Sequence, residues 1–425
     1  MYWEQTVEYA ALSDIGLRRT NNQDSCAVRI APDREMYESR GHLFVVADGM
    51  GGHAVGELAS RMATDVIPHT YAKLVNLPMS AALQQSLVEA NSTIYNRALQ
   101  NQDFLSMGTT CTSLALTPQG AIAAHVGDSR LYRVRGGLIE QLTFDHSVQW
   151  ELARNSQVPV DPKMMMEYRN VITRSLGPHP SVQVDVEGPY TVQPGDKYLL
   201  CSDGLSGLVS DEEIGMACHE LPPAEACQML VDLANLRGGS DNITVVVVRV
   251  GDVPPGLPPA SSTTMDAIQE EAPEPGWGWF TALCGHAALF FLAITMIALG
   301  RVVEGLLMLG LVLIVAGGLF VAWMRIFGTR QQNEATARRL AQPYRQASAQ
   351  FNPRFLTQLM SLEMILQQTT REAGWAINWQ AYNECMQRAQ EAWQRHDIPA
   401  TMRNIAHGLR RLLSQIQSER RKGIF

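Results

Sequence analysis

Four aspartates adjoin short, strongly apolar runs, and their carboxylates could act together if those runs are neighbouring strands. Asp48, Asp128, Asp203 and Asp241 each lie within two residues of such a run, respectively 43–47, 121–126, 197–201 and 243–250. A single Asp-Gly pair is most often a turn, because both residues tolerate the backbone angles that a turn requires. Four aspartates that each end or begin a strand instead indicate carboxylates brought to one place.

Clustered carboxylates repel one another and shift each other's pKa unless a cation neutralises them. Hard oxygen ligands of this kind favour Mg²⁺ or Mn²⁺, with waters in the remaining octahedral positions. Gly49 follows Asp48 and has no side chain, so its backbone carbonyl can also approach an ion. Two such ions a few ångströms apart can activate water for in-line attack on phosphorus.

The elements that must position these aspartates alternate irregularly over the first 250 residues. β-branched and aliphatic residues predict strands at Leu43–Ala47, Ala121–Val126, Lys197–Cys201 and Ile243–Val250. Apolar residues three and four apart predict helices at Glu57–Tyr71 and Met79–Gln100. Without a regular strand–helix alternation, this order predicts an α+β domain with mainly antiparallel sheets.

The length of 425 residues predicts more than one structural unit. The formal net charge is −8, and the acidic excess lies in the first 276 residues, whereas the tail after residue 328 is basic. An acidic front half argues against nucleic acid as a partner, because binding to the phosphate backbone needs clustered Lys and Arg. The seven scattered cysteines contain no C-x-x-C pair, a pattern typical of buried thiols in a reducing compartment.

Residues 251–276 are rich in proline and acidic side chains and predict an extended linker. Two runs without Asp, Glu, Lys or Arg follow, Phe280–Leu299 and Leu306–Met324, and each is long enough for one bilayer crossing. We therefore predict a transmembrane hairpin over 277–327; the alternative is a buried hairpin in a soluble domain. Arg325 and Arg330 place its end in the cytoplasm by the positive-inside tendency. Both flanking domains then face the cytoplasm, and the chain is a multi-pass protein of the plasma (inner) membrane.

The tail, residues 328–425, is predicted to be helical. Ile405, Leu409, Leu412 and Ile416 form one apolar stripe, and Asp397 has the position of a helix N-cap. The stripe could form the core of a small helical bundle, or a surface for self-association or for another partner. The basic face could be solvated or could contact anionic lipid headgroups.

Residues 8–250 resemble the protein phosphatase 2C (PPM) family through an ordered series of short motifs. The matching pieces lie at 13–24, 47–53, 107–110, 126–130, 142–147, 172–177, 202–205 and 240–244. The resemblance implies a four-layer αββα sandwich, in which two antiparallel sheets are flanked by helices and the metal site lies at one end. It also implies a protein serine/threonine phosphatase, with residues 147–173 as the flap beside its active site.

The resemblance assigns a role to each candidate residue. Asp48, Asp203 and Asp241 are implied to bind a pair of Mn²⁺ or Mg²⁺ ions, with the Gly49 carbonyl assisting. Asp128 is implied to bind a third, weaker ion. Arg19 matches the arginine that holds the substrate phosphate, a task suited to its planar guanidinium. Asp24 matches a carboxylate that orients water.

Two residues depart from the family pattern. Gln23 stands where many members have Glu, which removes a charge from the metal site, and Met50 stands where members from higher organisms have a histidine proposed as general acid.

We expect a membrane-tethered phosphatase that hydrolyses phosphoserine and phosphothreonine in proteins and opposes a cognate serine/threonine kinase. One rival hypothesis is a catalytically weak or inactive membrane scaffold that binds phosphoproteins. The other is a phosphatase of small molecules.

Overall fold

The computed structural model describes residues 7–51, 53–104, 106–155, 171–251, 289–323 and 344–422. Contacts divide the chain into two compact units. Unit 1 contains Met1–Pro254 together with Pro343–Phe425, and unit 2 contains Pro255–Gln342. The finer division into four parts at residues 250, 276 and 327 stays a prediction.

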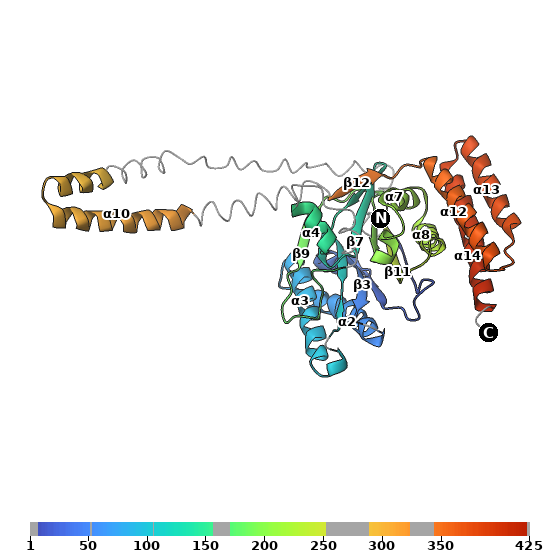
Figure 1. The fold of residues 1–425 in the computed structure, drawn as a ribbon, viewed down its shortest axis with the longest axis horizontal. Helices are drawn as coiled ribbons and strands as arrows, with labels where there is room; N and C mark the ends of the chain where they lie inside the picture. The colour runs from blue at the N-terminus through green and yellow to red at the C-terminus, as the bar shows by residue number, and fades with distance from the viewer. Residues whose placement is uncertain are drawn as a thin grey trace. The chain divides into compact units, whose positions relative to one another are not determined.

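Two antiparallel sheets form the centre of unit 1 (Figure 1). The first sheet has the order β1-β11-β10-β7-β8-β12, with bounds Glu8–Asp14, Ile243–Arg249, Lys197–Cys201, Arg130–Arg135, Leu138–Gln141 and Arg345–Ser348. The second sheet has the order β2-β3-β5-β6-β9, with bounds Asp24–Arg29, His42–Met50, Cys111–Thr117, Gly120–Val126 and Asp185–Tyr190; β4 (Gly108–Thr109) pairs with β3. The predicted α+β class with two antiparallel sheets is confirmed, and the predicted strands correspond to β3, β6, β10 and β11.

Burial on both faces of a strand explains the continuous apolar runs. In β11 the side chains alternate between two clusters, because successive residues of a strand point to opposite faces. Val246 and Val248 pack between the two sheets, whereas Val245 and Val247 pack under helices on the outer face of the first sheet. Residues 243–248 are therefore covered on both faces of the strand and show no alternation of buried and exposed positions.

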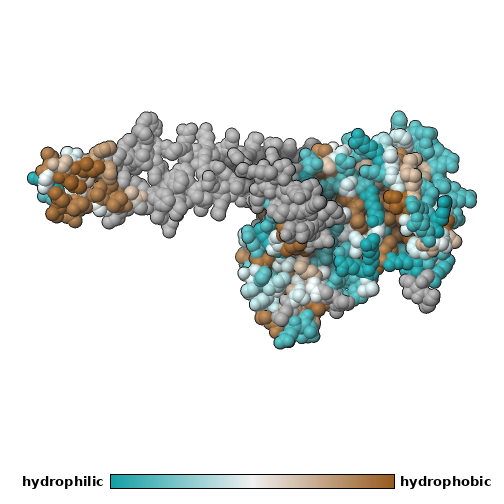
Figure 2. All heavy atoms as spheres, in the orientation of Figure 1, coloured by the Kyte–Doolittle hydropathy of each residue, from teal (hydrophilic) through white to brown (hydrophobic). Residues whose placement is uncertain are grey.

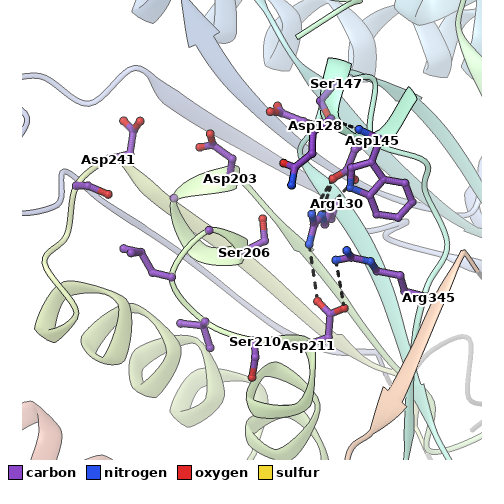
Figure 3. Close-up of a pocket in the computed structure, with 17 residues that line it drawn as sticks. Asp128, Arg130, Asp145, Ser147, Asp203, Ser206, Ser210, Asp211, Asp241 and Arg345 are labelled. Atoms are coloured by element: carbon purple, nitrogen blue, oxygen red, sulfur yellow. Dashed lines mark hydrogen bonds and ion pairs between the residues drawn. The ribbon is translucent and has the colours of Figure 1, made fainter. Parts of the chain in front are cut away.

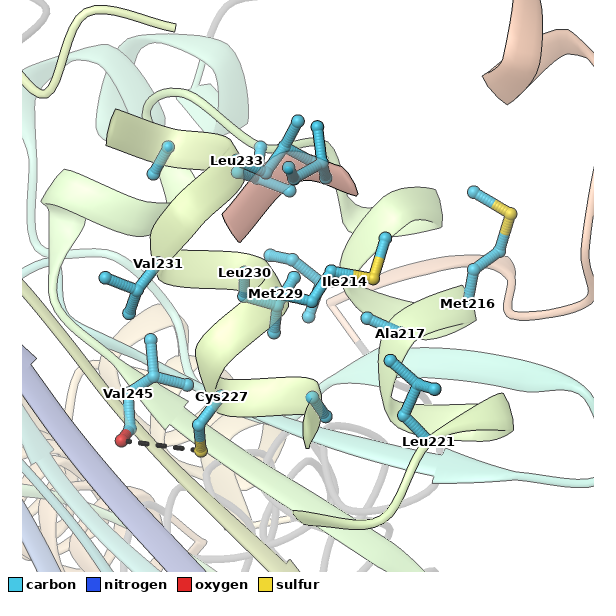
Figure 4. Close-up of a cluster of buried hydrophobic side chains, with 14 of the residues drawn as sticks. Ile214, Met216, Ala217, Leu221, Cys227, Met229, Leu230, Val231, Leu233 and Val245 are labelled. Carbon is cyan, nitrogen blue, oxygen red and sulfur yellow. Dashed lines mark hydrogen bonds between the residues drawn. The ribbon is translucent and has the colours of Figure 1, made fainter. Parts of the chain in front are cut away.

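Helices cover the outer face of each sheet. α2 (His53–Lys73) and α3 (Met79–Ala98) pack over the second sheet, and α7 (Asp211–Glu220) and α8 (Pro223–Leu236) pack over the first. Figure 4 shows the buried side chains of α7 and α8, with Cys227 placed against the Val245 carbonyl of β11. The remaining short elements of this part are α1 (Arg34–Arg40), η2 (Gln102–Phe104), α4 (Val148–Asn155) and α6 (Asp203–Ser206). The predicted four-layer sandwich is therefore present.

Unit 2 contains a helical hairpin. Residues 289–298 form its first helix and α10 (Val302–Trp323) its second, with Gly300 at a positive φ of 84° in the turn. A Cβ at Gly305 would lie 2.5 Å from Ile297 Cγ1, so glycine allows the two helices to approach closely. Figure 2 shows the apolar surface of this hairpin, and Phe291 and Leu307 are among its exposed apolar side chains. No helix within the described residues is both long and apolar enough to cross a membrane.

The tail returns to unit 1. β12 adds to the edge of the first sheet, and α12 (Arg354–Glu372), α13 (Trp379–Gln394) and α14 (Ile398–Lys422) follow it. The predicted stripe, Ile405, Leu409, Leu412 and Ile416, is buried in the same apolar cluster as residues of α8 and β11. Asp397 accepts a hydrogen bond from the Ala400 N–H at 3.0 Å, as an N-cap does.

Part of the predicted basic face makes ion pairs with α8. Arg403 lies 3.1 Å from Glu225, and Arg410 lies 3.0 Å from Asp232. The expectation that the tail is helical is wrong at Arg345–Ser348, which form β12. This four-residue strand is held by backbone hydrogen bonds to β8, a distant pairing that its own composition does not signal.

Candidate active site

Three neighbouring strands of the first sheet bring three of the predicted aspartates to one end. Asp203 follows β10, Asp241 precedes β11 and Asp128 precedes β7. Cys201 pairs with Val245 of β11 on one side and with Arg130 of β7 on the other. Because adjacent strands run antiparallel, the end of β10 lies beside the starts of β7 and β11, so the three carboxylates share this end of the sheet.

The second sheet adds two further carboxylates. Asp24 begins β2 and Asp48 lies near the end of β3, and the register places these two residues directly opposite each other. Like charges at directly opposed positions destabilise a sheet. Unless one of the two carboxyls is protonated, a bound cation is needed to offset the repulsion between them.

The backbone of Asp48 is held in place by two threonines. Its N–H donates to Thr110 Oγ1 at 2.9 Å, and its carbonyl accepts from Thr109 Oγ1 at 2.9 Å. The backbone after Asp203 is fixed by a close approach, because a Cβ at Gly204 would lie 2.0 Å from the Asn242 carbonyl oxygen. The glycine after Asp203 thus permits the contact that brings the Asp241 loop beside α6.

Burial and mutual repulsion raise the pKa values of four of these carboxyls. Burial raises the pKa of Asp24 to about 7 and that of Asp128 to about 8, each with a contribution from the charge of Asp203. Burial, followed by the charge of Asp24, raises the pKa of Asp48 well above its ordinary value. The pKa of Asp203 is raised by burial and by Asp241, while a hydrogen bond with Asp48 lowers it.

Two buried oxygens in this group, Asp24 Oδ1 and Asp203 Oδ1, have no hydrogen-bond partner among the described residues. Buried carboxylate oxygens without donors, surrounded by further carboxylates, form the donor set expected for a hard divalent cation. Within the described ranges, no three His, Cys, Asp or Glu side chains lie close enough together to coordinate one metal ion as they stand. The carboxylate oxygens of this group match the donor type that a hard divalent cation prefers.

Arg19 extends from the loop after β1 toward the same place. Its guanidinium donates to Asp241 Oδ2 at 2.8 Å, and its side chain remains 48% exposed. The hydrogen bond to Asp241 is the main cause of a raised pKa for Arg19. The charges of Asp48 and Asp203 contribute to the same shift, and both residues line one cleft with Arg19.

Asn242 is a positioning residue to which the sequence analysis gives no role. Its Nδ2 donates to the carbonyls of Ile15 and Asn21 at 2.9 and 3.0 Å, and its Oδ1 accepts from the Gln23 N–H at 2.8 Å. Asn242 thus joins the loop of Arg19 to the loop of Asp241. Asn242 lies in the family motif at 240–244, which marks it as a candidate. Its partners are distant in the sequence, so only the structure identifies them.

Two clefts meet at Asp203 and Asp241, which line both. One, of about 430 Å³, also contains Arg19, Asp48 and Met50. The other, of about 520 Å³, contains Asp128, Arg130, Trp150, Asp211 and Arg345 (Figure 3).

The two departures from the family pattern lie beside the first cleft. Met50 lines it and has no proton to donate. Gln23 lines it too, and a Cβ at Gly56 of α2 would lie 2.5 Å from Gln23 Nε2. The middle of the predicted flap, residues 156–170, lies outside the described residues.

Comparisons with known proteins place the chain among phosphatases. The family model described as Protein phosphatase 2C matches residues 18–232, which include Arg19, Asp24, Asp48, Asp128 and Asp203. Protein phosphatase PhpP of Streptococcus pneumoniae is 34% identical over 249 residues, covering 58% of this chain and 98% of PhpP. Serine/threonine protein phosphatase PstP of Mycobacterium tuberculosis is 36% identical over 249 residues, covering 58% of this chain and 45% of PstP.

Two solved structures are similar to the same part of the chain. The crystal structure of the M. tuberculosis serine/threonine phosphatase PstP/Ppp is 35% identical with a TM-score of 0.51, covering 58% of this chain and 99% of that one. The structure of the S. agalactiae serine/threonine phosphatase is 35% identical with a TM-score of 0.52, covering 57% of this chain and 99% of that one.

Proposed function

The chain belongs to the protein phosphatase 2C family and is a protein serine/threonine phosphatase; we propose that its reaction occurs at the carboxylate group shared by the two clefts. The observation that carries this proposal is the convergence of Asp24, Asp48, Asp128, Asp203 and Asp241 on one end of the two sheets, beside Arg19.

In this proposal Asp48, Asp203 and Asp241 hold two divalent cations, with the Gly49 carbonyl as a further ligand and Asp128 holding a weaker third. A Cβ at Gly49 would lie 2.0 Å from the Gly56 carbonyl oxygen, so only glycine allows this tight backbone. Mn²⁺ or Mg²⁺, when bound, supplies the Lewis acidity that activates water for attack on phosphorus.

The chain's own residues hold the substrate. Arg19 is half exposed in the smaller cleft, and its guanidinium can donate two parallel hydrogen bonds to a phosphate. Asp24 is fixed by the Ser202 hydroxyl, which donates to its Oδ2 at 2.7 Å, so its free Oδ1 can orient a water. Because Met50 has no acidic proton, we expect water in the cleft to protonate the leaving seryl or threonyl oxygen.

The assay for this proposal is Mn²⁺-dependent phosphate release from a phosphothreonine peptide by the full chain, beside Asp241→Asn. We expect release by the wild type and at least a hundredfold less by the variant. Equal release by both would remove Asp241 from the reaction. Peptide binding without release by either would favour the scaffold hypothesis.

We further propose that residues 277–327 tether the phosphatase to the plasma (inner) membrane as a two-helix hairpin. Two observations support this: the two uncharged runs of the sequence, and the return of the chain to one sheet. β11 precedes these residues and β12 follows them, and both belong to the first sheet, which supports a segment that enters and leaves the membrane on the same side. Reporter fusions at residues 2 and 425 should both report cytoplasm; opposite sides would contradict the hairpin.

A cytoplasmic placement of unit 1 would give the active site access to proteins phosphorylated by a cognate serine/threonine kinase. We keep this kinase, and self-association through the tail, as proposals. Chemical crosslinking of the intact protein, compared with a chain ending at residue 342, would test whether the tail joins two copies.

A further inference from the structure

The larger cleft contains one residue from the tail. Arg345 begins β12 and pairs with Gln141 of β8, and the Tyr344 N–H donates to the Gln141 carbonyl at 3.0 Å. The other end of the strand is held by the Ala349 N–H, which donates to the Gly137 carbonyl at 2.8 Å. The sheet thus fixes the backbone from which Arg345 reaches into the cleft.

The residue before Arg345 is anchored independently. The Tyr344 hydroxyl donates to Glu187 Oε1 at 2.6 Å, and its ring lies 5.6 Å from the Phe144 ring. These contacts connect β12 to both sheets. They hold the start of the strand in register, so the position of Arg345 does not depend on its own side-chain contacts.

The Arg345 guanidinium lies over an aromatic ring. Its central carbon is 4.7 Å from the centroid of the Trp150 ring. Its nearest carboxylate oxygen is Asp211 Oδ2 at 3.9 Å, a distance too long for a hydrogen bond, and the side chain is 50% exposed. A guanidinium stacked in this way is pre-oriented, and its edge donors remain accessible to an incoming anion.

Arg130, in the same cleft, is in the opposite situation. It donates three hydrogen bonds to Asp145, at 2.7–3.1 Å, and one to the Tyr132 hydroxyl at 3.0 Å, and its side chain is only 13% exposed. Arg130 is therefore a buried structural cation. Of the two described cations that line this cleft, Arg345 is the one whose side chain is half exposed.

We propose that Arg345 is a specificity-determining residue that binds an anionic side chain flanking the phosphorylated serine or threonine of the protein substrate. This inference rests on the phosphatase activity proposed for the same site. Asp128, Asp203 and Asp241 line the same cleft as Arg345, so a peptide whose phosphoryl group reaches them extends toward β12 (Figure 3). A cleft of about 520 Å³ is in the range that holds ligands larger than one phosphoryl group.

The charges around Arg345 permit an additional anion. Asp145 is matched by Arg130, and Asp211 accepts a hydrogen bond from the Tyr132 hydroxyl at 2.8 Å and lies 3.7 Å from Arg130. Asp211 therefore keeps its hydrogen bond from Tyr132 and its ion pair with Arg130 when Arg345 binds a substrate. The anion can be a carboxylate or a second phosphate, since either accepts two hydrogen bonds from a guanidinium.

The experiment compares, at each flanking position, three phosphothreonine peptides in which that position carries Ala, Asp or a non-hydrolysable phosphonate analogue of phosphoserine. Each position from two before to two after the phosphothreonine is sampled in turn. kcat/KM is measured with Mn²⁺ for the full-length wild type, Arg345→Ala, Arg345→Lys and the matched control Arg354→Ala. Arg354 is an exposed arginine at the start of α12 and does not line the cleft.

We expect the wild type to have a higher kcat/KM for the peptide with an anionic residue at one flanking position. In Arg345→Ala, the ratio of kcat/KM for the anionic peptide to that for the Ala peptide should fall about tenfold, the usual effect of one charge-assisted hydrogen bond. The loss should appear in KM, Arg345→Lys should keep part of the preference, and Arg354→Ala should keep all of it. A larger effect with the Asp peptide would show that Arg345 binds a carboxylate, and a larger effect with the phosphonate peptide would show that it binds a phosphate.

An unchanged preference in Arg345→Ala, or an equal loss with all three peptides, would overturn this inference. Release from the Ala peptide by the wild type reports the phosphatase reaction separately. Its absence would overturn the proposed reaction itself, which distinguishes the two failures.

Discussion

The catalytic region, residues 8–250, and the tail, residues 344–422, belong to one compact unit but are specified differently. Short sequence motifs identify the catalytic region, and the family match at 18–232 falls entirely within it. The tail lies after that match, yet β12 extends the first sheet and α14 shares an apolar cluster with α8. A change in composition along this chain therefore does not mark the edge of a folded unit.

The largest expected effect lies in the catalytic region. Asp203→Asn should lower kcat of Mn²⁺-dependent peptide dephosphorylation by roughly a thousandfold. The substitution removes the charge of one metal ligand, and the bound metal stabilises the transition state by several kcal/mol. Steady-state kinetics on the phosphothreonine peptide measure it. The matched control is Asp65→Asn, an exposed change on α2 that should leave kcat unaltered. A similar kcat for wild type and Asp203→Asn would contradict the role of Asp203.

The next effect tests whether the tail belongs to the catalytic unit. Leu412 of α14 is 1% exposed in the cluster that also contains residues of α8 and β11. Leu412→Ala should lower the free energy of unfolding by about 3 kcal/mol, and phosphatase activity should be lost at the same lower temperature as helicity. Met360→Ala, at a side chain 62% exposed, is the control and should have little effect. Loss of tail helicity at a temperature where activity persists would show two separate units.

A smaller, pH-dependent effect is expected at the ion pair between α14 and α8. Burial raises the pKa of Asp232 to about 6, and the neighbouring Arg410 lowers it. A carboxyl whose folded pKa exceeds its unfolded value contributes stability at low pH that is lost as the pH rises through the folded pKa. Removing the cation in Arg410→Gln raises the pKa further, so the variant should lose about 1–2 kcal/mol at pH 8 and less at pH 4.5. Urea unfolding at both pH values measures this.

The control for that prediction is Arg411→Gln, an exposed neighbour on the same helix. It should show no difference between the two pH values. An Arg410→Gln variant with the same loss at pH 4.5 and pH 8 would mean that Asp232 is not the group that responds.

The smallest effect is expected at Arg403, whose partner Glu225 also connects α14 to α8. Both side chains are largely exposed, at 50% and 43%, so water screens the pair. Arg403→Ala should change the free energy of unfolding by less than about 0.5 kcal/mol. A loss as large as that of Arg410→Gln at pH 8 would show that exposure does not separate the two pairs.

The strands and the metal-binding aspartates of the catalytic region could be predicted from the sequence, because short local patterns mark them. β10 has the predicted bounds Lys197–Cys201, since an apolar run covered on both faces is readable without knowing its neighbours. The aspartates could be predicted to converge because each stands at the end of such a run. Their order along the sheets, and the opposition of Asp24 and Asp48, required the register.

The sequence was insufficient where a residue acts through a distant partner. β12 contains only Arg345–Ser348, and its pairing with β8 spans about two hundred residues of chain. Arg345 could not be placed in the cleft without that pairing. Asn242 had a visible motif, but its bonds to the Arg19 loop exist only in the folded chain.

The central claim is that these carboxylates form a metal site, and calorimetric titration of the intact protein with Mn²⁺ tests it without reference to turnover. The account predicts saturable binding at two sites in the wild type, and loss of at least one in both Asp203→Asn and Asp241→Asn. Asp65→Asn should bind as the wild type does. Absence of saturable Mn²⁺ binding in the wild type, or full binding retained in both site variants, would contradict it.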